Sequence, residues 1–227
     1  GTIIEYDEQG RIVWSWKSSN YFDQSDLIHY KPADGGPVND IHANAFFFDE
    51  REKVIYLSFK NVSRVIKVKY PEGTVLNAYG SVYKRGGKPE GNSLFCQQHA
   101  CKRSQVGCLF LFNNNGCNPG FSPKVKMLQE PLSEKEQLKM IWEYECVIDE
   151  GYAKTALSGG NVMDMPDKCL FISMGGAYSK LMIVNMEKEL LWSAVSEEWK
   201  PDEKKWIANA QYRASIIPDY KKMERLI

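Results

Sequence analysis

Apolar and polar residues alternate over short stretches along most of this chain. Residues 41 to 80 contain four such stretches, separated by short polar turns such as "DEREK" and "PEG". Valine, isoleucine, tyrosine and phenylalanine dominate them, and these residues favour the pleated surface of a sheet. Strands of about 5 to 8 residues joined by tight turns are typical of an antiparallel meander. The pattern therefore predicts four antiparallel strands, the first of them "IHANAFFF".

The same four-part pattern recurs twice more. The second unit runs from "QQHACKR" to "LKMIWEYE", and the third runs from "ALSGGNVMDMP" to "ELLWSAV". Half a unit, "TIIEYDEQGRIVWSW", precedes the first, and "WIANAQYRASIIP" follows the third as a candidate first strand of a further unit. Such a repeat predicts an all-β fold, a β-propeller of four-stranded antiparallel blades. A β-sandwich is the alternative, which explains the strands but not the repeat.

The units amount to about four blades, within a single propeller domain over residues 1–227. The last strand could pair with the opening half-unit and close a small ring. The sequence favours a second interpretation, in which this chain is part of a larger propeller and either assembles with copies of itself or needs the remaining blades.

Composition narrows the range of partners. The 227 residues include 29 Lys+Arg and 29 Asp+Glu, so the net charge is zero. This balance does not indicate nucleic acid as a partner. No apolar run approaches the roughly 20 residues that span a bilayer, so membrane insertion is not expected.

Six cysteines are more than a typical cytosolic enzyme of this length carries. No C-x-x-C pair is present, and no set of cysteines and histidines has the spacing of a zinc finger. The spacing favours disulfides or inert core thiols over a metal site. The four cysteines that lie close together are Cys96, Cys101, Cys108 and Cys117.

Two of the three histidines occupy matching places in the repeat. His42 lies in the first strand of the first unit, and His99 lies 57 residues later in the first strand of the second. A further 59 residues lead to Ser158 in the third unit. The first strand of each propeller blade lines the central channel. The repeat therefore predicts that both histidines face one channel, although a histidine on a strand can also be a purely structural residue.

The strand that carries His42 begins with three polar side chains at alternate positions. Asp40, His42 and Asn44 are expected to share one face, because side chains alternate along a strand. A polar face on an innermost strand fits a channel that contains water or a ligand. Lys60, at the end of the next strand, is expected to reach the same opening.

The ordered motifs "DIHANAFFF", "LSFKNVSRVIKV", "FCQQHACKR" and "LFLFNNN" resemble the arylsulfotransferase family, bacterial enzymes that do not use the nucleotide sulfate donor. "GRIVWSW" and "YRA" (residues 212–214) also resemble that family. The resemblance implies a six-bladed β-propeller that moves a sulfuryl group from an aryl sulfate to a phenol through a histidine. It implies small-molecule partners, no cofactor and no metal. It also implies an exported protein, in the periplasm, at the cell surface or secreted.

The resemblance assigns catalytic roles to four residues. His99 matches the histidine that accepts the sulfuryl group, and a neutral imidazole is a good nucleophile near neutral pH. His42 and Asn44 match the residues that hold the sulfuryl oxygens. Lys60 stands where the family usually has an arginine, and a lysine replaces the planar fork of arginine by a point charge.

The resemblance also suggests substrate-binding residues and disulfides. Thr155 or Ser158 matches a further Thr/Ser position of the family, and Arg213 of "YRA" is expected to bind substrate. The family has a further histidine upstream. In this chain the only histidine upstream is His29, and the sequence around His29 does not match that of the family. For an exported protein, the plausible disulfides are Cys108–Cys117 or Cys96–Cys101.

Two hypotheses about function remain. The first is an arylsulfotransferase that acts through sulfo-His99. The second is a non-catalytic propeller that binds a ligand or a protein at its channel mouth, which the lysine at position 60 favours. A propeller with a metal or quinone cofactor has little support, because histidines and carboxylates do not cluster at ligand spacing.

Overall fold

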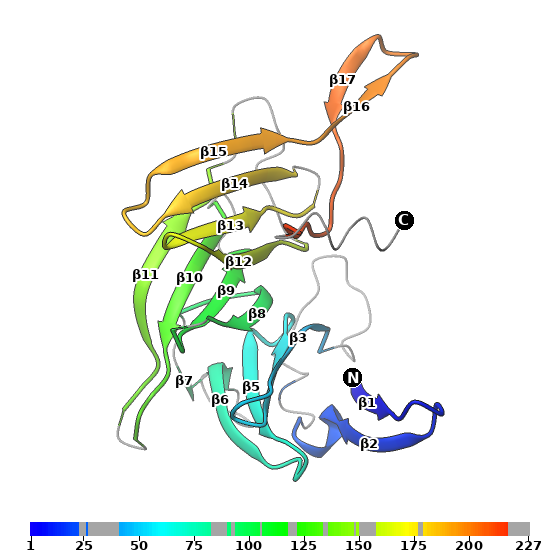
Figure 1. The fold of residues 1–227 in the computed structure, drawn as a ribbon, viewed down its shortest axis with the longest axis vertical. Helices are drawn as coiled ribbons and strands as arrows, with labels where there is room; N and C mark the ends of the chain where they lie inside the picture. The colour runs from blue at the N-terminus through cyan, green and yellow to red at the C-terminus, as the bar shows by residue number, and fades with distance from the viewer. Residues whose placement is uncertain are drawn as a thin grey trace.

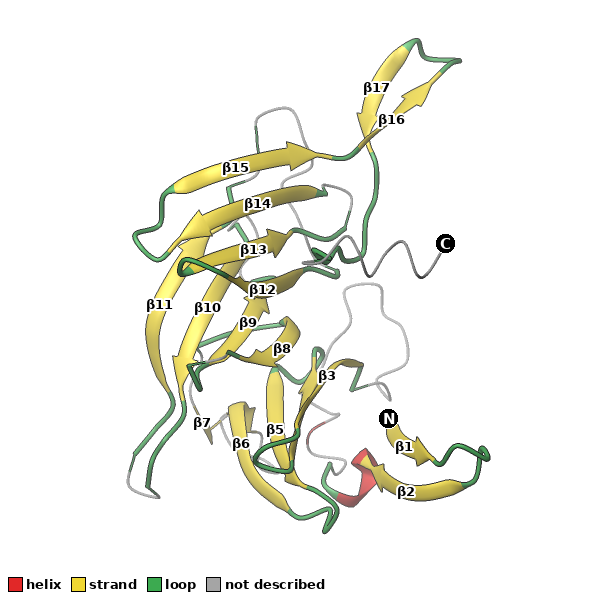
Figure 2. Cartoon of the chain, in the orientation of Figure 1, coloured by secondary structure: helices red, strands yellow, loops and turns green. Residues whose placement is uncertain are grey.

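The described part of the protein consists mainly of β-strands joined by loops, together with a 3-10 turn at Ser18–Asn20 (Figure 2). The four-stranded antiparallel sheets confirm the predicted all-β fold of propeller blades. Three residues named above, His29, Asp40 and Thr155, lie outside the described residues. The computed structural model describes residues 1–22, 26, 41–82, 90–91, 94–104, 106–117, 122–133, 136–147, 149, 158–176 and 179–217.

The first blade is the predicted meander that starts near residue 41. Its strands pair in chain order, and a two-residue fifth strand that the sequence did not indicate extends its edge. The strands are β3 (Ala43–Asp49), β4 (Val54–Phe59), β5 (Arg64–Lys69), β6 (Val75–Val82) and β7 (Glu90–Gly91).

The second and third blades are four-stranded meanders, also paired in chain order. The second contains β8 (His99–Arg103), β9 (Leu109–Asn113), β10 (Lys124–Gln129) and β11 (Lys139–Glu145). The third contains β12 (Asn161–Met165), β13 (Cys169–Ser173), β14 (Lys180–Asn185) and β15 (Leu190–Val195). In Figure 1 the blades form a fan in which β3, β8 and β12 lie on the inner side, and β6, β11 and β15 lie on the outer side.

Two hairpins flank the blades. The predicted half-unit at the start of the chain forms β1 (Thr2–Tyr6) and β2 (Ile12–Lys17), which pair with each other. At the other end, β16 (Glu197–Lys200) pairs with β17 (Lys205–Ala208) in a hairpin that projects from the third blade (Figure 1).

The expectation that "WIANAQYRASIIP" begins a further blade is wrong for the described residues. Its first residues belong to β17, whose partner is the neighbouring β16. From there to residue 217, the β-pairing of the segment is an isolated bridge between Gly176 and Gln211. Within the described part of the chain, no strand pairing joins this segment to β1, so the small ring is not formed there.

The hydrophobic core lies between neighbouring blades, and β9 shows why. Leu109 and Leu111 pack with residues of the first blade, whereas Phe110 and Phe112 pack with residues of the third. Successive side chains of a strand point to opposite faces, and both faces of β9 are covered. This burial explains the unbroken apolar run "CLFLF". On the far side of the first blade, Trp16 of β2 packs in a third core cluster.

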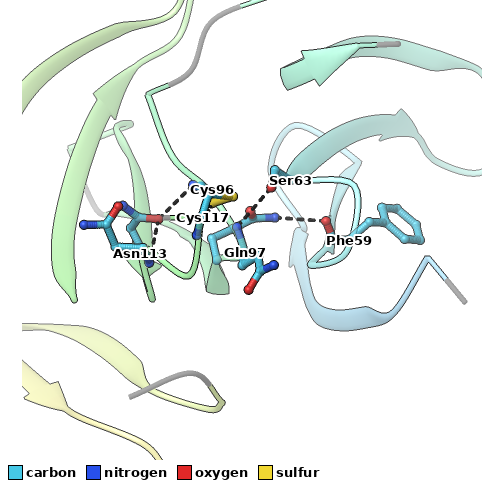
Figure 3. Close-up of a disulfide and its surroundings, with 8 residues drawn as sticks. Phe59, Ser63, Cys96, Gln97, Asn113 and Cys117 are labelled. Atoms are coloured by element: carbon cyan, nitrogen blue, oxygen red, sulfur yellow. Dashed lines mark hydrogen bonds between the residues drawn. A yellow bond between two sulfur atoms is a disulfide. The ribbon is translucent and has the colours of Figure 1, made fainter. Parts of the chain in front are cut away.

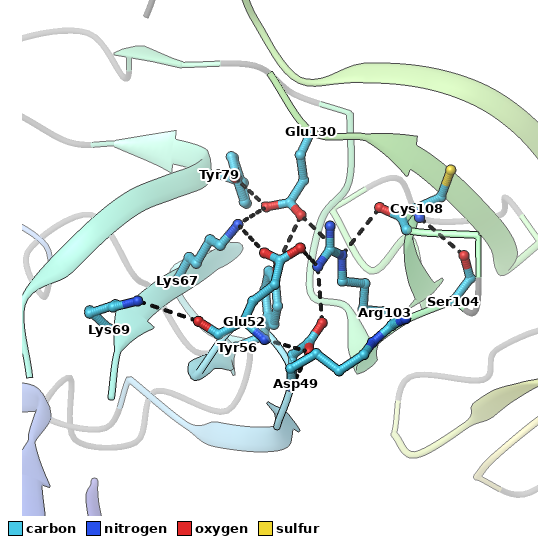
Figure 4. Close-up of polar contacts among 12 residues, drawn as sticks. Asp49, Glu52, Tyr56, Lys67, Lys69, Tyr79, Arg103, Ser104, Cys108 and Glu130 are labelled. Carbon is cyan, nitrogen blue, oxygen red and sulfur yellow. Dashed lines mark hydrogen bonds and ion pairs between the residues drawn. The ribbon is translucent and has the colours of Figure 1, made fainter. Parts of the chain in front are cut away.

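A polar network also joins the first and second blades (Figure 4). Glu130, directly after β10, accepts hydrogen bonds from the hydroxyls of Tyr56 at 2.7 Å and Tyr79 at 2.6 Å, and from the Lys67 ammonium at 3.2 Å. Beside it, Arg103 of β8 donates to Asp49 of β3 at 2.9 Å. These contacts hold β8 against the first blade and so position the residues at its start.

Candidate active site

The inner strands of the three blades meet where the sequence places the histidines. β8 contacts both β3 and β12. His42 directly precedes β3, and His99 is the first residue of β8. The centroids of the two imidazole rings are 6.5 Å apart. The matching repeat positions therefore bring these two side chains together in space.

A β-bulge at the start of each of these strands determines how the side chains point. Asn44 in β3 and Ala100 in β8 stand opposite no residue of the neighbouring strand. His42 has a φ of 55° and Ala100 a φ of 49°, both in the left-handed region. The expected regular alternation through His42 and Asn44 is therefore wrong, because the backbone leaves the extended conformation at His42. Bulges of this kind re-aim side chains and are common beside active sites.

The His99 imidazole is buried, with 1% of its surface exposed. Its Nδ1 lies 2.7 Å from Oδ1 of Asn114. Its Nε2 has no hydrogen-bond partner among the described residues. A buried polar atom without a partner requires an explanation, such as a bound ligand or an ordered water.

Two glycines bring the third blade close to this imidazole. Gly159 accepts a hydrogen bond from the Asn114 amide at 3.1 Å, and the amide of Gly160 donates to the Tyr212 carbonyl at 2.8 Å. Gly160 has a φ of 101°, and a Cβ atom there would overlap the Phe112 ring. Only glycine permits this approach.

The segment after β17 passes over the same place. Tyr212 lies with its ring centroid 5.9 Å from that of His99. Arg213 donates from Nη2 to the Asn44 carbonyl at 2.7 Å, and the Asn44 side chain donates to the Gln98 carbonyl at 2.7 Å. Asn44 Oδ1 and Arg213 Nε are buried without a partner among the described residues. Together with His99 Nε2, these atoms form a cluster of buried polar atoms that have no hydrogen-bond partner among the described residues.

Lys60 lies in the turn that follows β4, and its backbone amide donates to the His42 carbonyl at 3.0 Å. Burial lowers the pKa of the Lys60 ammonium. Ser158 is exposed and precedes β12 by three residues, so its side chain is not part of the buried cluster.

The pKa of His99 lies well below its ordinary value. Burial is the largest cause and lowers it from 6.5 to about 4, although the hydrogen bond to Asn114 opposes the shift. The charges of Lys60 and Arg213 lower it further, and so does His42. His99 is therefore a neutral imidazole at neutral pH, which is the nucleophilic form.

A mostly apolar pocket of about 370 Å³ opens beside Asn44 and Arg213. A pocket of this size is at the lower end of the range for small-molecule sites. Trp16, Phe46 and Phe59 supply its aromatic walls.

Sequence reasoning missed three residues of this site. Asn114 lies in the "NNN" run and Tyr212 in the "YRA" motif, so both were visible as parts of motifs but had no assigned role. Gln98, the residue before His99, is fully buried. Its side chain donates to the Ser58 hydroxyl at 2.9 Å, which holds the start of β8 in place. Gln98 lies in the "FCQQHACKR" motif and also had no assigned role.

Among the described residues, no three His, Cys, Asp or Glu side chains converge in a way that could hold a metal ion. The same residues include no helix with the length and apolar character needed to cross a membrane.

A disulfide between Cys96 and Cys117 lies next to the site, with Cα atoms 5.9 Å apart (Figure 3). The expected pairs Cys108–Cys117 and Cys96–Cys101 are wrong, and Cys101 and Cys108 are free thiols. Cys101 lies within the extended strand β8 with its side chain buried in the core, so it cannot turn back to Cys96. The disulfide joins the segments that carry His99 and Asn114.

Replacement of both disulfide cysteines by serine should lower the free energy of unfolding by about 3 kcal/mol, because the bond closes a loop with a sequence separation of 21 residues. Urea unfolding of the double variant measures this loss. The control is a Cys108→Ser/Cys169→Ser variant, which removes two half-exposed free thiols. Equal stability of the two variants would contradict the expectation.

Comparisons with known proteins identify a family whose model matches this chain. A family model described as Arylsulfotransferase (ASST) matches residues 1–178. The search of curated proteins found no match. Similar solved structures include a protein of unknown function from Bacteroides caccae, with a TM-score of 0.48 and 7% identity over 88% of this chain and 62% of that chain. Another is Kluyveromyces lactis Hsv2, with a TM-score of 0.36 and 9% identity over 75% of this chain and 47% of that chain.

This chain thus spans 62% of the length of the Bacteroides caccae structure. The family match is the finding that bears on chemistry.

Proposed function

Because this chain belongs to the arylsulfotransferase family, we propose that it transfers a sulfuryl group from an aryl sulfate to a phenolic acceptor through a sulfo-histidine at His99. Family membership supports sulfotransferase activity in general. The observation that carries the finer proposal is the buried, neutral imidazole of His99, whose Nε2 has no partner among the described residues.

The proposed reaction has two steps. First, Nε2 of His99 attacks the sulfur, the bond between sulfur and the aryl oxygen breaks, and the aryl oxygen leaves with the bonding electrons. Second, the phenol oxygen attacks the same sulfur and loses its proton to water, and the electrons of the nitrogen–sulfur bond return to Nε2. Covalent catalysis of this kind divides one difficult transfer into two easier steps.

Positive charge and hydrogen-bond donors around His99 support this role. Lys60, His42 and Arg213 are close enough to His99 to alter its pKa. Such donors stabilise charge on the oxygens of a transferring group when they are fixed in place before the reaction. Asn44, whose side chain is held by the Gln98 carbonyl, is proposed to contribute its amide.

The pocket beside Asn44 and Arg213 supports an aromatic substrate. Its walls include Trp16, Phe46 and Phe59, which can stack against or enclose an aryl ring. We assign it to the aryl group of the donor or acceptor. Arg213, which also lines this pocket, would bind the sulfate charge.

The proposed location is an exported one, in the periplasm or at the cell surface. The Cys96–Cys117 disulfide supports it, because structural disulfides persist in oxidising compartments and are rare in the cytosol.

The test is transfer from 4-nitrophenyl sulfate to phenol, followed by release of nitrophenolate and compared with a His99 variant. Release that requires both phenol and His99 supports the proposal. No release from the folded wild-type chain would favour the non-catalytic, ligand-binding propeller.

The acid limb of kcat/KM should lie near pH 4, because kcat/KM reports the ionisation of the free enzyme and burial lowers the pKa of His99 to about 4. Between about pH 5 and neutral pH, the protonation of His99 should not change the rate. A pH profile of nitrophenolate release at fixed ionic strength measures this. An acid limb at the ordinary histidine value of 6.5 would contradict the lowered pKa of His99.

A further inference from the structure

Asn114 links the second blade to the third beside His99. It follows β9 directly, and 2% of its surface is exposed. Its Oδ1 lies 2.7 Å from His99 Nδ1, at the start of β8. Its Nδ2 donates to the Gly159 carbonyl at 3.1 Å, just before β12. The side chain therefore contacts both the inner strand of its own blade and the segment that leads into the inner strand of the third blade.

This arrangement determines which imidazole nitrogen carries the proton. A backbone carbonyl only accepts hydrogen bonds, so the Gly159 carbonyl requires the NH₂ group of Asn114 on its side. The amide oxygen then faces His99, and it can only accept. The 2.7 Å contact consequently requires a proton on Nδ1. A neutral imidazole has one N–H, so Nε2 carries the lone pair.

We propose that Asn114 is a positioning residue that holds His99 in the Nδ1–H tautomer and thereby makes Nε2 the nitrogen that accepts the sulfuryl group. This inference rests on the proposed function of His99. The buried Nε2 without a partner among the described residues is the atom that the tautomer leaves available. Asn114 acts through His99 and does not itself touch the reacting sulfur.

A neutral amide suits both steps better than a carboxylate would. In the first step, the nitrogen–sulfur bond forms while Nδ1 keeps its proton, and the amide oxygen accepts a hydrogen bond from the more positive ring. In the second step, the imidazole must leave the sulfur with the bonding electrons. A carboxylate beside Nδ1 would favour the protonated ring and raise the pKa of His99. A more basic imidazole is a poorer leaving group, so the second step would slow.

Asn113 provides a matched control for this role. It is the preceding residue and is equally buried, with 2% of its surface exposed. Its Oδ1 accepts hydrogen bonds from the backbone amides of Cys96 at 2.8 Å and Asn115 at 3.3 Å, which a carboxylate could also accept. Asn113→Asp therefore adds the same charge to the same segment without replacing the direct partner of His99.

The test measures which nitrogen of the His99 imidazole carries the proton, by long-range proton–nitrogen correlation NMR of the ¹⁵N-labelled full chain. The His99 signals are assigned by their absence from the spectrum of a His99→Gln variant. The wild type should show the Nδ1–H tautomer. Asn114→Asp should raise the pKa of His99 by about one unit or more, and by more than Asn113→Asp does. Asn114→Leu should show a mixture of tautomers. A wild-type Nε2–H tautomer would overturn the proposal even if neither Asn114 variant folds.

Activity gives an independent measurement. In Asn114→Leu, kcat should fall by about 100-fold or more, since a wrong imidazole tautomer is costly in hydrolases that use histidine. In Asn114→Asp, the acid limb of kcat/KM should move with the pKa measured by NMR. An Nδ1–H wild type without any transfer would contradict the proposed function and leave supported only the tautomer that Asn114 imposes on His99. Transfer by a wild type with the Nε2–H tautomer would overturn the positioning role alone.

Discussion

Replacement of His99 by alanine should abolish phenol-dependent release of nitrophenolate from 4-nitrophenyl sulfate, a loss of at least about 10³-fold in kcat. The reason is that the side chain is proposed to form the nitrogen–sulfur bond, and no other described imidazole occupies its place. His42 lies next to it but directly precedes a different strand, β3. The expected loss is therefore larger than for any residue that only stabilises charge.

The measurement combines turnover with trapping of the intermediate. With ³⁵S-labelled aryl sulfate and no acceptor, the label should be recovered on the peptide that contains His99 and should be absent from His99→Ala. A His42→Ala variant is the comparator. It should react more slowly and still carry the label at His99, because His42 is proposed to hold sulfuryl oxygens. Full turnover by His99→Ala, or turnover by the wild type with no adduct at all, would refute the histidine mechanism.

Folding of the His99 variants needs its own control, because the imidazole is buried. His99→Gln places an amide where the imidazole contacts Asn114, so it preserves more of the buried hydrogen bonding than alanine does. Both variants should retain the circular dichroism spectrum and cooperative thermal unfolding of the wild type. Loss of activity in a folded variant can then be attributed to chemistry.

The largest expected effect on stability is at Glu130. Its side chain is 10% exposed, and Glu130→Leu removes the common acceptor of Tyr56, Tyr79 and Lys67. The free energy of unfolding should fall by about 3–5 kcal/mol, because the variant leaves two buried tyrosine hydroxyls without their acceptor and leaves the Lys67 charge with the longer contact to Glu52 at 3.9 Å. Burial and the adjacent carboxylate raise the pKa of both tyrosines, so their hydroxyls remain donors at neutral pH.

Glu143 provides the matched control. It forms ion pairs with Lys124 at 3.0 Å and Lys126 at 2.9 Å, but its side chain is 26% exposed and all three residues belong to one blade. Glu143→Leu should change the free energy of unfolding by about 0–1 kcal/mol, as is usual for ion pairs near the surface. Urea unfolding of both variants tests the contrast. Similar losses in the two variants would show that the Glu130 network does not hold the blades together.

The sequence predicted much of the fold because its periodicity reports local structure. Apart from β7, each strand of the three blades overlaps a stretch that alternation and turn residues had marked, and the repeat indicated blades instead of a sandwich. The exceptions are informative. The terminal segment has the composition of a strand, yet it pairs with β16, because pairing partners depend on which edge is available and not on composition.

For the site, the sequence by itself determined that His42 and His99 occupy matching repeat positions, and the strand period then placed both at the inner edges of neighbouring blades. Only the tertiary structure decided how the side chains point and what they contact. The bulges at Asn44 and Ala100 are cross-strand register shifts, which leave no mark in a hydrophobic pattern. The hydrophobic pattern also gave no sign of the Cys96–Cys117 disulfide or of the hydrogen bonds that connect His99, Asn114 and the Gly159 carbonyl. These contacts join residues from different strands and blades, and periodicity along one strand carries no information about which distant residue will face it.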